Sequence, residues 1–400
     1  MHIGRCHPHT LGATGGDGVT ETLLQFGSGN FLRAFVDLFL HEANATSDGY
    51  GRAAVVTTTD SPRGRWINDQ LGQYHVAIRG LHEGARVVET VAVTRALSRS
   101  LIAAQDWAEV LRIGASPDLR WIVSNTTEAG LRLDPADDIT TWPAAVDDGG
   151  TQGPHSFPAK LLAVLAHRMA SGAAPVAVLP CELVEGNGPV LLDLLQTQAN
   201  IWRLPQDLLD AIGTCPVSST LVDRIVSGRP EEHPLLAQDQ LLTVAEPFAS
   251  WVIEQRPGLD LFPHAAITIT DDVAEYCLRK VRILNGAHTA LVCATRSLDI
   301  ETVGEAVTHP SVGAWLRRVL FDEILPVVDG RVVDGASFAT ATLERFANPF
   351  QRHRLADIAL HHETKVATRL MPTYHEYVER FDEPPPLLGE ILQPYLHSSN

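Results

Sequence analysis

The chain has 400 residues, of which 45% are hydrophobic and 20% charged, a composition ordinary for a globular protein and sufficient for two domains with separate cores. Its formal net charge of −17 argues against nucleic acid or an anionic membrane surface as a partner. No apolar run approaches the roughly 20 residues that span a bilayer, and residues 1–20 lack the apolar core of a signal peptide, so we expect them to form a flexible lead-in.

The cysteines predict a reducing compartment. They are odd in number, widely scattered and without a C-x-x-C pair, and this pattern is not that of a disulfide framework. We therefore expect the cytoplasm as the location. Cys6, His7 and His9 are metal-ligating residue types, but their spacing is not a usual zinc spacing, and we predict no bound metal. The five cysteines are Cys6, Cys181, Cys215, Cys277 and Cys293.

The first predicted strand, residues 22–26, runs through a glycine-containing turn into a helical pattern over residues 34–40. Glycines let a backbone approach a pyrophosphate closely, and a helix N-terminus supplies free N–H groups. The G-x-G-x-x-G pattern is incomplete, because Leu32 stands at the third glycine position, so a tight turn without a ligand is the alternative. The dinucleotide contacts expected here are Phe26, Gly27, Gly29, Asn30 and Phe31.

A second strand, predicted over residues 53–59, ends at Asp60, whose carboxylate is placed to accept hydrogen bonds from an adenosine ribose. The alternative is that Asp60 only caps a helix that begins near Ser61-Pro62. Arg63 and Arg65 follow closely and would suit a 2′-phosphate. We therefore expect NAD as the cofactor, without excluding NADP.

Two further predicted strands, residues 119–124 and 175–180, also end in small polar residues. Polar groups at the carboxyl ends of parallel strands face the ligand crevice of an open sheet. Asn125, Thr126 and Glu128 are therefore expected to contact the cofactor. Strands that alternate with helices predict an α/β protein with an N-terminal Rossmann-like, doubly wound sheet.

From Tyr276 onward the pattern becomes mostly helical, with apolar residues three and four apart over 303–328 and 355–370. We predict a dinucleotide-binding domain over 21–272, a helical substrate-binding domain over 273–400, and the active site between them.

An acidic substrate needs a cationic partner in so acidic a chain. His353, Lys365 and Arg369 fall in a stretch, 348–370, that we expect to be helical, and Lys365 and Arg369 are four residues apart and share a face. An arginine binds a carboxylate through two parallel hydrogen bonds. The alternative is a solvated helix face.

The stretch from Lys280 to Thr289 is the most informative segment. Apolar neighbours are expected to desolvate Lys280 partly, which disfavours its charged form and suits a group that gives and takes a proton. Asn285 can donate to a polarised oxygen, and His288 can hold a hydroxyl. Offsets of five and eight residues do not form one α-helical stripe, so we expect the backbone to unwind near Gly286. A surface helix with a solvated lysine is the alternative.

Taken together, four segments resemble the mannitol dehydrogenase family of polyol-specific long-chain dehydrogenases. The resemblance runs from about Leu23 to about Pro372, and no single motif is specific. Within the family, the sequences of these segments are most similar to the branch that interconverts D-tagaturonate and D-altronate. The four segments are residues 25–35, 124–130, 222–225 and 280–289.

The resemblance implies a zinc-independent enzyme in which Lys280 is the proton donor and acceptor. It implies that Asn285 and a second asparagine, Asn187, polarise the reacting oxygen and that His288 binds the substrate. It also places residues matching Asp223 and Lys365 near the substrate, and we add Arg224, His353 and Arg369 as substrate-binding candidates.

The expected function is thus NAD-dependent reduction of D-tagaturonate by a monomer or small homo-oligomer that takes small sugar acids or polyols. Two alternatives stay open. One is a relative that acts on fructuronate or mannonate, on mannitol or on another polyol. The other is a catalytically silent sugar-acid sensor, although the intact Lys280, Asn285 and His288 speak against it.

Overall fold

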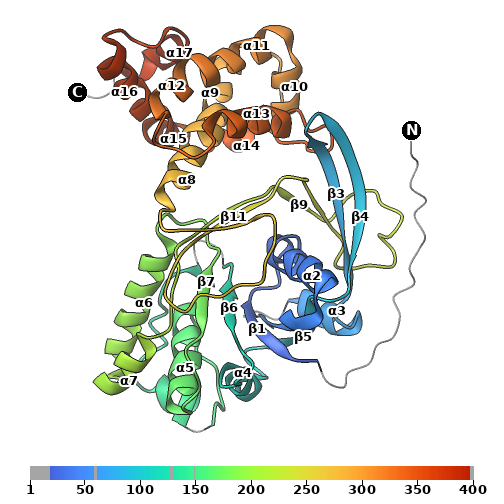
Figure 1. The fold of residues 1–400 in the computed structure, drawn as a ribbon, viewed down its shortest axis with the longest axis vertical. Helices are drawn as coiled ribbons and strands as arrows, with labels where there is room; N and C mark the ends of the chain where they lie inside the picture. Colours follow the sequence, from blue (N-terminus) through green and yellow to red (C-terminus); the bar gives the residue numbers. More distant parts are fainter. Residues whose placement is uncertain (1–18, 58–60, 127–129, 148, 397–400) are drawn as a thin grey trace.

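The structure is a computed structural model that describes residues 19–57, 61–126, 130–147 and 149–396. A sheet-containing N-terminal part lies at one end of the molecule and a helical C-terminal part at the other, joined by α8 (Ala274–Arg279) (Figure 1). Among the described residues, no helix is long and apolar enough to cross a bilayer.

The central sheet has five parallel strands in the order β5-β2-β1-β6-β7. The chain builds outward from β1 to β2 and β5, and then returns to the other side of β1 for β6 and β7. The order therefore reverses between β1 and β6, which is the switch point where doubly wound sheets bind ligands. The predicted fold class is confirmed. The strands are β1 (Glu21–Phe26), β2 (Arg52–Thr57), β5 (Leu97–Ile102), β6 (Trp121–Ser124) and β7 (Ala177–Pro180).

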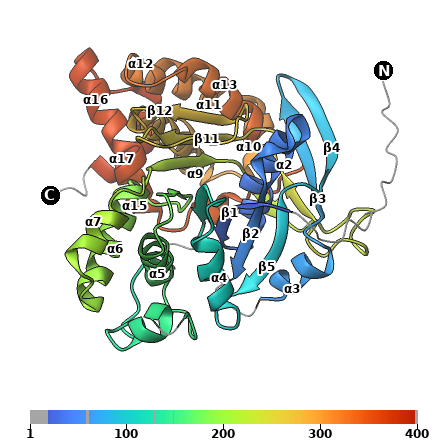
Figure 2. The ribbon, with the colours of Figure 1, turned by 60° about the horizontal axis from the view of Figure 1, so that its bottom comes forward.

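Successive side chains of β1 point to opposite faces of this sheet and enter separate cores. Leu24 and Phe26 pack with helices α4 (Trp107–Gly114) and α5 (Phe157–Ala170), whereas Leu23 packs with α2 (Val36–Thr46) on the other face. A strand buried on both faces is mostly apolar, which explains the largely hydrophobic sequences of β1 and β2. Figure 2 shows α4 and α5 together on the same side of the strands. The remaining helices of this part are α1 (Asn30–Arg33), η1 (Asp48–Tyr50), α3 (Pro62–Asp69), η3 (Pro143–Asp147), α6 (Asn187–Trp202) and α7 (Gln206–Ile212).

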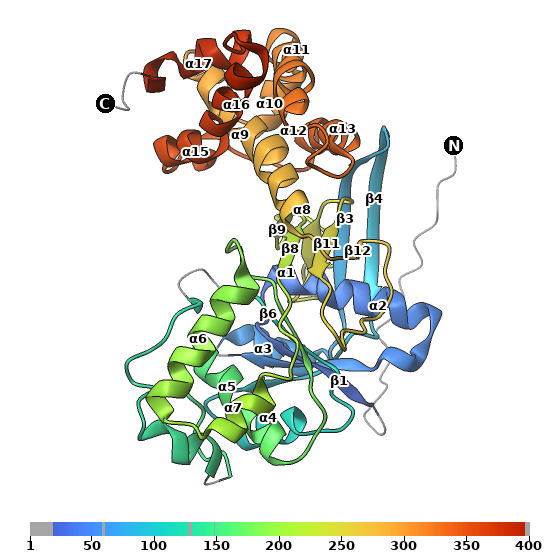
Figure 3. The same ribbon diagram turned by 60° about the vertical axis from the view of Figure 1, so that its left-hand side comes forward.

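Two smaller sheets, which the sequence did not predict, connect the central sheet to the helical part. One has the order β4-β3-β10-β9 and contains a long hairpin; the other has the order β12-β11-β8. Figure 3 shows the hairpin of β3 and β4 reaching toward the helical part beside α13 (Gly335–Phe346). The strands are β3 (Tyr74–His82), β4 (Ala85–Val93), β8 (Thr220–Asp223), β9 (Val226–Gly228), β10 (Thr243–Ala245), β11 (Ser250–Glu254) and β12 (Ile267–Thr270).

The helical part packs around its own core, in which Ile283, Leu291, Leu320 and Val366 are nearly or fully buried. The expectation of a helical C-terminal half is confirmed. Its elements are η4 (Lys280–Asn285), α9 (Gly286–Thr295), α10 (Val303–Thr308), α11 (Pro310–Arg318), η5 (Val319–Ile324), α12 (Leu325–Val328), α13 (Gly335–Phe346), α14 (Leu355–Ile358), α15 (His362–Arg369), α16 (Met371–Phe381) and α17 (Pro386–Leu396).

Two local expectations for this part are wrong. The backbone does not unwind at Gly286, which has regular helical angles; instead residues 280–285 form a π-helix that continues into α9. Residues 348–354 are not helical, because Asn348 closes a turn by accepting a hydrogen bond from the Phe350 N–H. His353 therefore precedes α14 in an extended segment whose next residue, Arg354, forms an isolated β-bridge with Thr302.

Candidate active site

A cavity of about 560 Å³ lies at the switch point of the central sheet. The carboxyl ends of β1, β2 and β6 form its floor, and the start of α5 forms one wall. Among the predicted cofactor contacts it is lined by Phe26, Gly27, Gly29, Asn125 and Thr126. The other lining residues are Ser28, Thr57, Ser61, Arg63, Gly130, Arg132, Leu133, Asp134, His155, Ser156 and Phe157.

The glycine turn in this crevice needs its glycines for different reasons. Gly27 has φ +122°, a conformation that side chains rarely adopt, and a Cβ there would lie 3.2 Å from the Asn125 carbonyl oxygen. A Cβ on Gly29 would have no atom within 4 Å, so the backbone at Gly29 faces open space. Open space beside a glycine lets a ligand group come close to the backbone, and the pyrophosphate of a dinucleotide requires such a close approach.

Arg33 fixes the shape of this turn through hydrogen bonds to two of its residues. Its side chain is 2% exposed and donates to the Ser28 carbonyl and to Asn30 Oδ1, the latter at 2.6 Å. Phe31 stacks on Phe35 with ring centroids 4.8 Å apart. Asn30 and Phe31 thus make contacts within the turn, and their predicted contact with the cofactor stays a prediction.

Glu182 is a buried acid that connects the ends of β6 and β7. One carboxylate oxygen accepts the backbone N–H of Thr126 at 2.9 Å, and the other accepts the Ser124 hydroxyl at 3.1 Å. Burial raises its pKa, although these hydrogen bonds oppose the rise. Asn125 donates to the Cys181 carbonyl at 2.6 Å. Glu182 therefore holds the loop that carries Asn125 and Thr126, a role that its place in the sequence did not suggest. Two predicted contacts, Asp60 and Glu128, lie outside the described residues.

Lys280, Asn285 and His288 share one continuous helix at the boundary between the two parts of the molecule. In a π-helix the hydrogen bonds run between residues five apart, so the π-helical turn brings Lys280 and Asn285 closer to one face than an α-helix would. Lys280 is partly buried, and its Nζ donates to the Val222 carbonyl at 2.8 Å. No described residue bonds the side-chain amide of Asn285.

His288 has an unsatisfied nitrogen in a cationic environment. The residue is 8% exposed, and its Nε2 has no hydrogen-bond partner among the described residues. Its ring stacks on Phe346 at 4.1 Å and meets His353 edge-on at 4.9 Å. Burial holds the pKa of His288 well below its ordinary value, helped by the nearby charges of His353 and Arg345. A buried polar atom without a partner normally meets one in the functional state.

Lys365 and Arg369 both lie on α15, as predicted, and both contribute to the positive potential at His288. Lys365 is partly buried and donates to the Ile358 carbonyl at 2.8 Å. Arg369 makes a long contact of 3.5 Å with the Thr289 hydroxyl. Four N–H groups of Arg369 thus have no described acceptor, and the guanidinium can still bind an anion.

Asp223, Arg224 and Asn187 are buried, and each is engaged by other groups of the protein. Asp223 pairs with Arg345 through both carboxylate oxygens. Arg224 donates to the carbonyls of Glu246 and Ala34. The Asn187 amide donates to the Pro180, Glu182 and Thr220 carbonyls and accepts the Thr220 N–H. Their predicted contacts with substrate therefore stay predictions.

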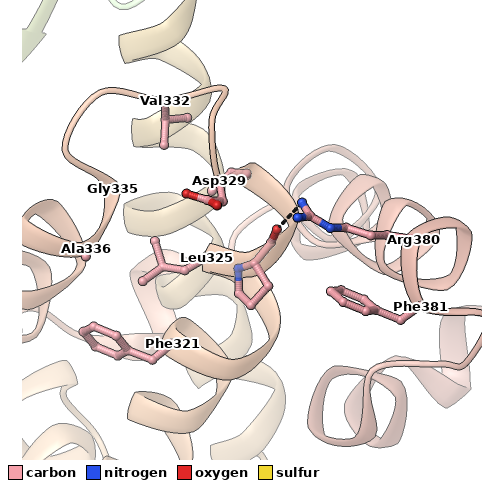
Figure 4. Close-up of a pocket in the computed structure, with 10 residues that line it drawn as sticks. Phe321, Leu325, Asp329, Val332, Gly335, Ala336, Arg380 and Phe381 are labelled. Atoms are coloured by element: carbon pink, nitrogen blue, oxygen red, sulfur yellow. Dashed lines mark hydrogen bonds between the residues drawn. The ribbon is translucent and has the colours of Figure 1, made fainter.

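A second cavity, of about 460 Å³, lies in the helical part among α12, α13 and α16 (Figure 4). Phe321, Leu325 and Phe381 line it, and Arg380 donates across its edge to the Pro326 carbonyl at 2.6 Å. None of the predicted site residues lines it. Among the described residues, no group of three or more His, Cys, Asp or Glu side chains is placed to hold a metal ion.

A doubly wound sheet, a glycine turn at its switch point and a helical second part are typical of oxidoreductases of the dinucleotide-binding class. The mannitol dehydrogenase Rossmann domain model matches residues 21–261, and the mannitol dehydrogenase C-terminal domain model matches residues 272–390. The chain therefore belongs to the mannitol dehydrogenase family.

The relatives agree with this assignment. An altronate oxidoreductase of Halalkalibacterium halodurans is 36% identical over 388 residues, which cover 92% of this chain and 73% of that protein. An altronate oxidoreductase of Klebsiella pneumoniae is 38% identical over 371 residues, which cover 88% and 74%.

Two solved structures share the fold. A D-sorbitol dehydrogenase in substrate-free form has a TM-score of 0.79 at 21% identity and covers 96% of this chain and 82% of its own. The mannitol 2-dehydrogenase of Pseudomonas fluorescens, in a ternary complex with NAD and D-mannitol, has a TM-score of 0.71 at 22% identity and covers 94% and 78%.

Proposed function

We propose that this protein reversibly reduces D-tagaturonate to D-altronate with NADH. The observation that carries the proposal is the π-to-α helix from Lys280 to His288. It presents an amine, an amide and an imidazole nitrogen beside the cations of α15, and neither the amide nor the imidazole nitrogen has a partner among the described residues. The relatives named altronate oxidoreductase at 35–38% identity support the choice of substrate.

The proposed cofactor is NAD, for which the crevice at the switch point has suitable residues. Gly29 leaves room for the pyrophosphate, and Thr57 and Thr126 line the crevice at the strand ends. NADH bound there supplies the hydride. Arg63 also lines the crevice and would favour a 2′-phosphate, so NADPH belongs in every assay.

The proposed chemistry of the chain's own residues follows from charge. The ketone oxygen gains negative charge during reduction, and donors aimed at it in a water-poor site lower the barrier. The Asn285 amide has no acceptor in the described part of the chain and can donate, and Lys280 has N–H groups beyond the one that Val222 holds. Lys280 then delivers its proton to the oxygen of the ketone as this becomes an alkoxide, which gives the alcohol. His288 receives a substrate hydroxyl at its unsatisfied Nε2.

The substrate carboxylate is proposed to bind at α15. Lys365 and Arg369 are the cations on that helix, and Arg369 has N–H groups available for a carboxylate. A neutral ketose lacks the group that these cations would bind. A preference for an acidic substrate over its neutral counterpart is therefore the direct consequence of this arrangement.

A kinetic panel tests the proposal. Initial rates would be measured with D-tagaturonate, D-fructuronate and D-fructose, each with NADH and NADPH. We expect kcat/KM to be highest for tagaturonate with NADH. Arg369→Lys should lower kcat/KM for tagaturonate by about tenfold, because a lysine cannot form two parallel bonds, and leave fructose unaffected. A preference of the wild type for fructose would reject the uronate assignment. NADH binding without turnover on any ketose would favour a silent sensor.

We also propose that the protein acts in the cytoplasm as a monomer or small homo-oligomer, on small molecules alone. The cysteines among the described residues, Cys181, Cys215, Cys277 and Cys293, are free thiols, which is the state that a reducing compartment maintains.

A further inference from the structure

Arg345 is a buried arginine that belongs to neither the crevice nor the predicted site. It lies on the last turn of α13, in the helical part, and is 4% exposed. Its guanidinium binds two carboxylates of the sheet-containing part at once. One is Asp223 at the end of β8, at 2.9 and 3.1 Å; the other is Glu246 just after β10, at 2.8 Å.

This ion cluster connects three elements that the sequence places far apart. β8 and β10 belong to different small sheets, and α13 belongs to the other part of the molecule. Glu246 also accepts the Ile225 N–H at 2.7 Å, and the Arg345 guanidinium lies 4.3 Å from the centre of the Phe248 ring. Bidentate contacts with a planar guanidinium fix orientation as well as distance. The cluster therefore sets how α13 sits on the ends of both strands.

Two proposed catalytic groups depend on the elements that Arg345 joins. The carbonyl that accepts from Lys280 Nζ belongs to Val222, the residue before Asp223. The ring that stacks on His288 belongs to Phe346, the residue after Arg345. A shift of α13 against β8 would thus move the support of Lys280 relative to that of His288.

Electrostatics link the cluster to Lys280 as well. Burial opposes ionisation of Asp223, yet Arg345 and Lys280 together hold its pKa below the ordinary value. Burial keeps the pKa of Glu246 raised in spite of Arg345. Two buried carboxylates with one arginine leave the cluster short of positive charge, and Lys280 supplies part of it.

We propose that Arg345 is a positioning residue for the reaction. It fixes α13 to the ends of β8 and β10 and thereby sets the position of Lys280 relative to His288. The proposal rests on the function proposed for Lys280. It predicts that Arg345 acts through Lys280 rather than through overall stability, and a double-mutant cycle separates these two possibilities.

The experiment compares wild type, Arg345→Lys, Lys280→Ala and the double variant. Turnover with NADH would be measured on tagaturonate, or on the best ketose of the panel, with NADH affinity from fluorescence titration. Arg345→Lys keeps the charge but loses the fork that holds both carboxylates. We expect about a tenfold loss of kcat, NADH affinity within about twofold, and almost no further loss in the Lys280→Ala background.

Arg99→Lys is a matched control, because Arg99 also bridges two carboxylates, those of Glu21 and Glu109, away from the site. It should leave kcat unchanged. If Arg345→Lys does not fold, Glu246→Gln replaces it, since the amide keeps an acceptor for Arg345 and removes one charge. The proposal would be overturned if Arg345→Lys lowered kcat by the same factor in the wild-type and Lys280→Ala backgrounds. It would also be overturned if Arg345→Lys alone kept a kcat within twofold of wild type. A Lys280→Ala variant with full turnover would instead reject the proposed function itself.

Discussion

Gly27 and Gly29 occupy one turn, but a methyl group added at each meets different surroundings. At Gly29 the methyl would enter open crevice space, whereas at Gly27 it would require a strained φ of +122°. We predict that Gly29→Ala lowers NADH affinity by about tenfold or more without changing stability. Gly27→Ala should lower the free energy of unfolding by roughly 1–3 kcal/mol.

Fluorescence titration with NADH and urea unfolding of both variants would check this contrast. The physical reason is that Gly29 needs no side chain because a ligand comes close, while Gly27 needs none because of its own backbone. Unchanged NADH affinity in Gly29→Ala would show that the pyrophosphate does not lie at this turn.

Asp37 is a fully buried carboxyl on α2, and burial raises its pKa from 3.8 to about 7. The Gln25 amide donates to it at 3.3 Å and Arg33 lies nearby, but neither restores the ordinary value. The folded protein thus holds a proton that the unfolded chain has released between about pH 4 and pH 7. The free energy of unfolding should therefore fall as pH rises through this window.

Asp37→Asn tests this prediction, since the amide keeps an acceptor for Gln25 but does not titrate. A rise from 3.8 to about 7 corresponds to about 4 kcal/mol, which is the largest gain expected for the variant at pH 8. At pH 4 the two proteins should be similar. Urea unfolding at several pH values measures the difference, and identical pH slopes would contradict it.

The β3–β4 hairpin is the element that reaches farthest from its own sheet. At its tip the backbone N–H groups of Glu83 and Gly84 donate to the Glu344 carboxylate on α13, and lower down Asn348 donates to the Arg79 carbonyl at 3.1 Å. The hairpin therefore braces α13, one residue from Arg345.

We predict that Glu344→Ala speeds hydrogen exchange at the hairpin tip by about tenfold or more, because hydrogen bonds to a charged group contribute roughly 1.5–3 kcal/mol. Exchange monitored by mass spectrometry would measure it. Glu390→Ala, an exposed glutamate on α17, is the control and should leave the tip unchanged. Equal protection in both variants would mean that the hairpin is held by its own strands alone.

Four strands of the central sheet, β1, β2, β6 and β7, could be predicted because each is a largely apolar run followed by small polar residues. The fifth strand, β5, was not predicted, because Ser98, Arg99 and Ser100 interrupt its apolar residues. β4 could not be predicted in this way, because it is exposed along most of its length and carries little alternation. The Glu83-Gly84 turn, with positive φ at both residues, was the available indication of the hairpin. β8 and β10 are three or four residues long, and β10 pairs with residues 76–78, far away in sequence.

At the scale of the whole molecule, the candidate site combines local motifs with long-range contacts. Lys280, Asn285 and His288 lie within nine residues, so the sequence alone brought them together. Arg345 and Glu182 act through partners that are distant in sequence or at a neighbouring strand end, and no spacing rule identifies such residues. The π-helical turn likewise depends on how η4 packs, since its composition is that of an ordinary helix.

The acidic whole and the cationic site have opposite charges. With a net charge of −17, the protein repels anions at long range, so the cations around His288 must attract an acidic substrate at short range. Salt at 0.1 M screens the interaction between exposed charges beyond about 10 Å. The proposed reaction thus requires that Lys280 gives its proton to a substrate held at the boundary between the sheet-containing and helical parts.

The most direct test is turnover of D-tagaturonate with NADH by wild type and Lys280→Ala, with NADH affinity measured in parallel. We expect the variant to lose about 10²-fold or more of kcat, as for the loss of a general acid, while NADH binds as before. A variant that turns over within twofold of wild type would contradict the account, because another group would then supply the proton.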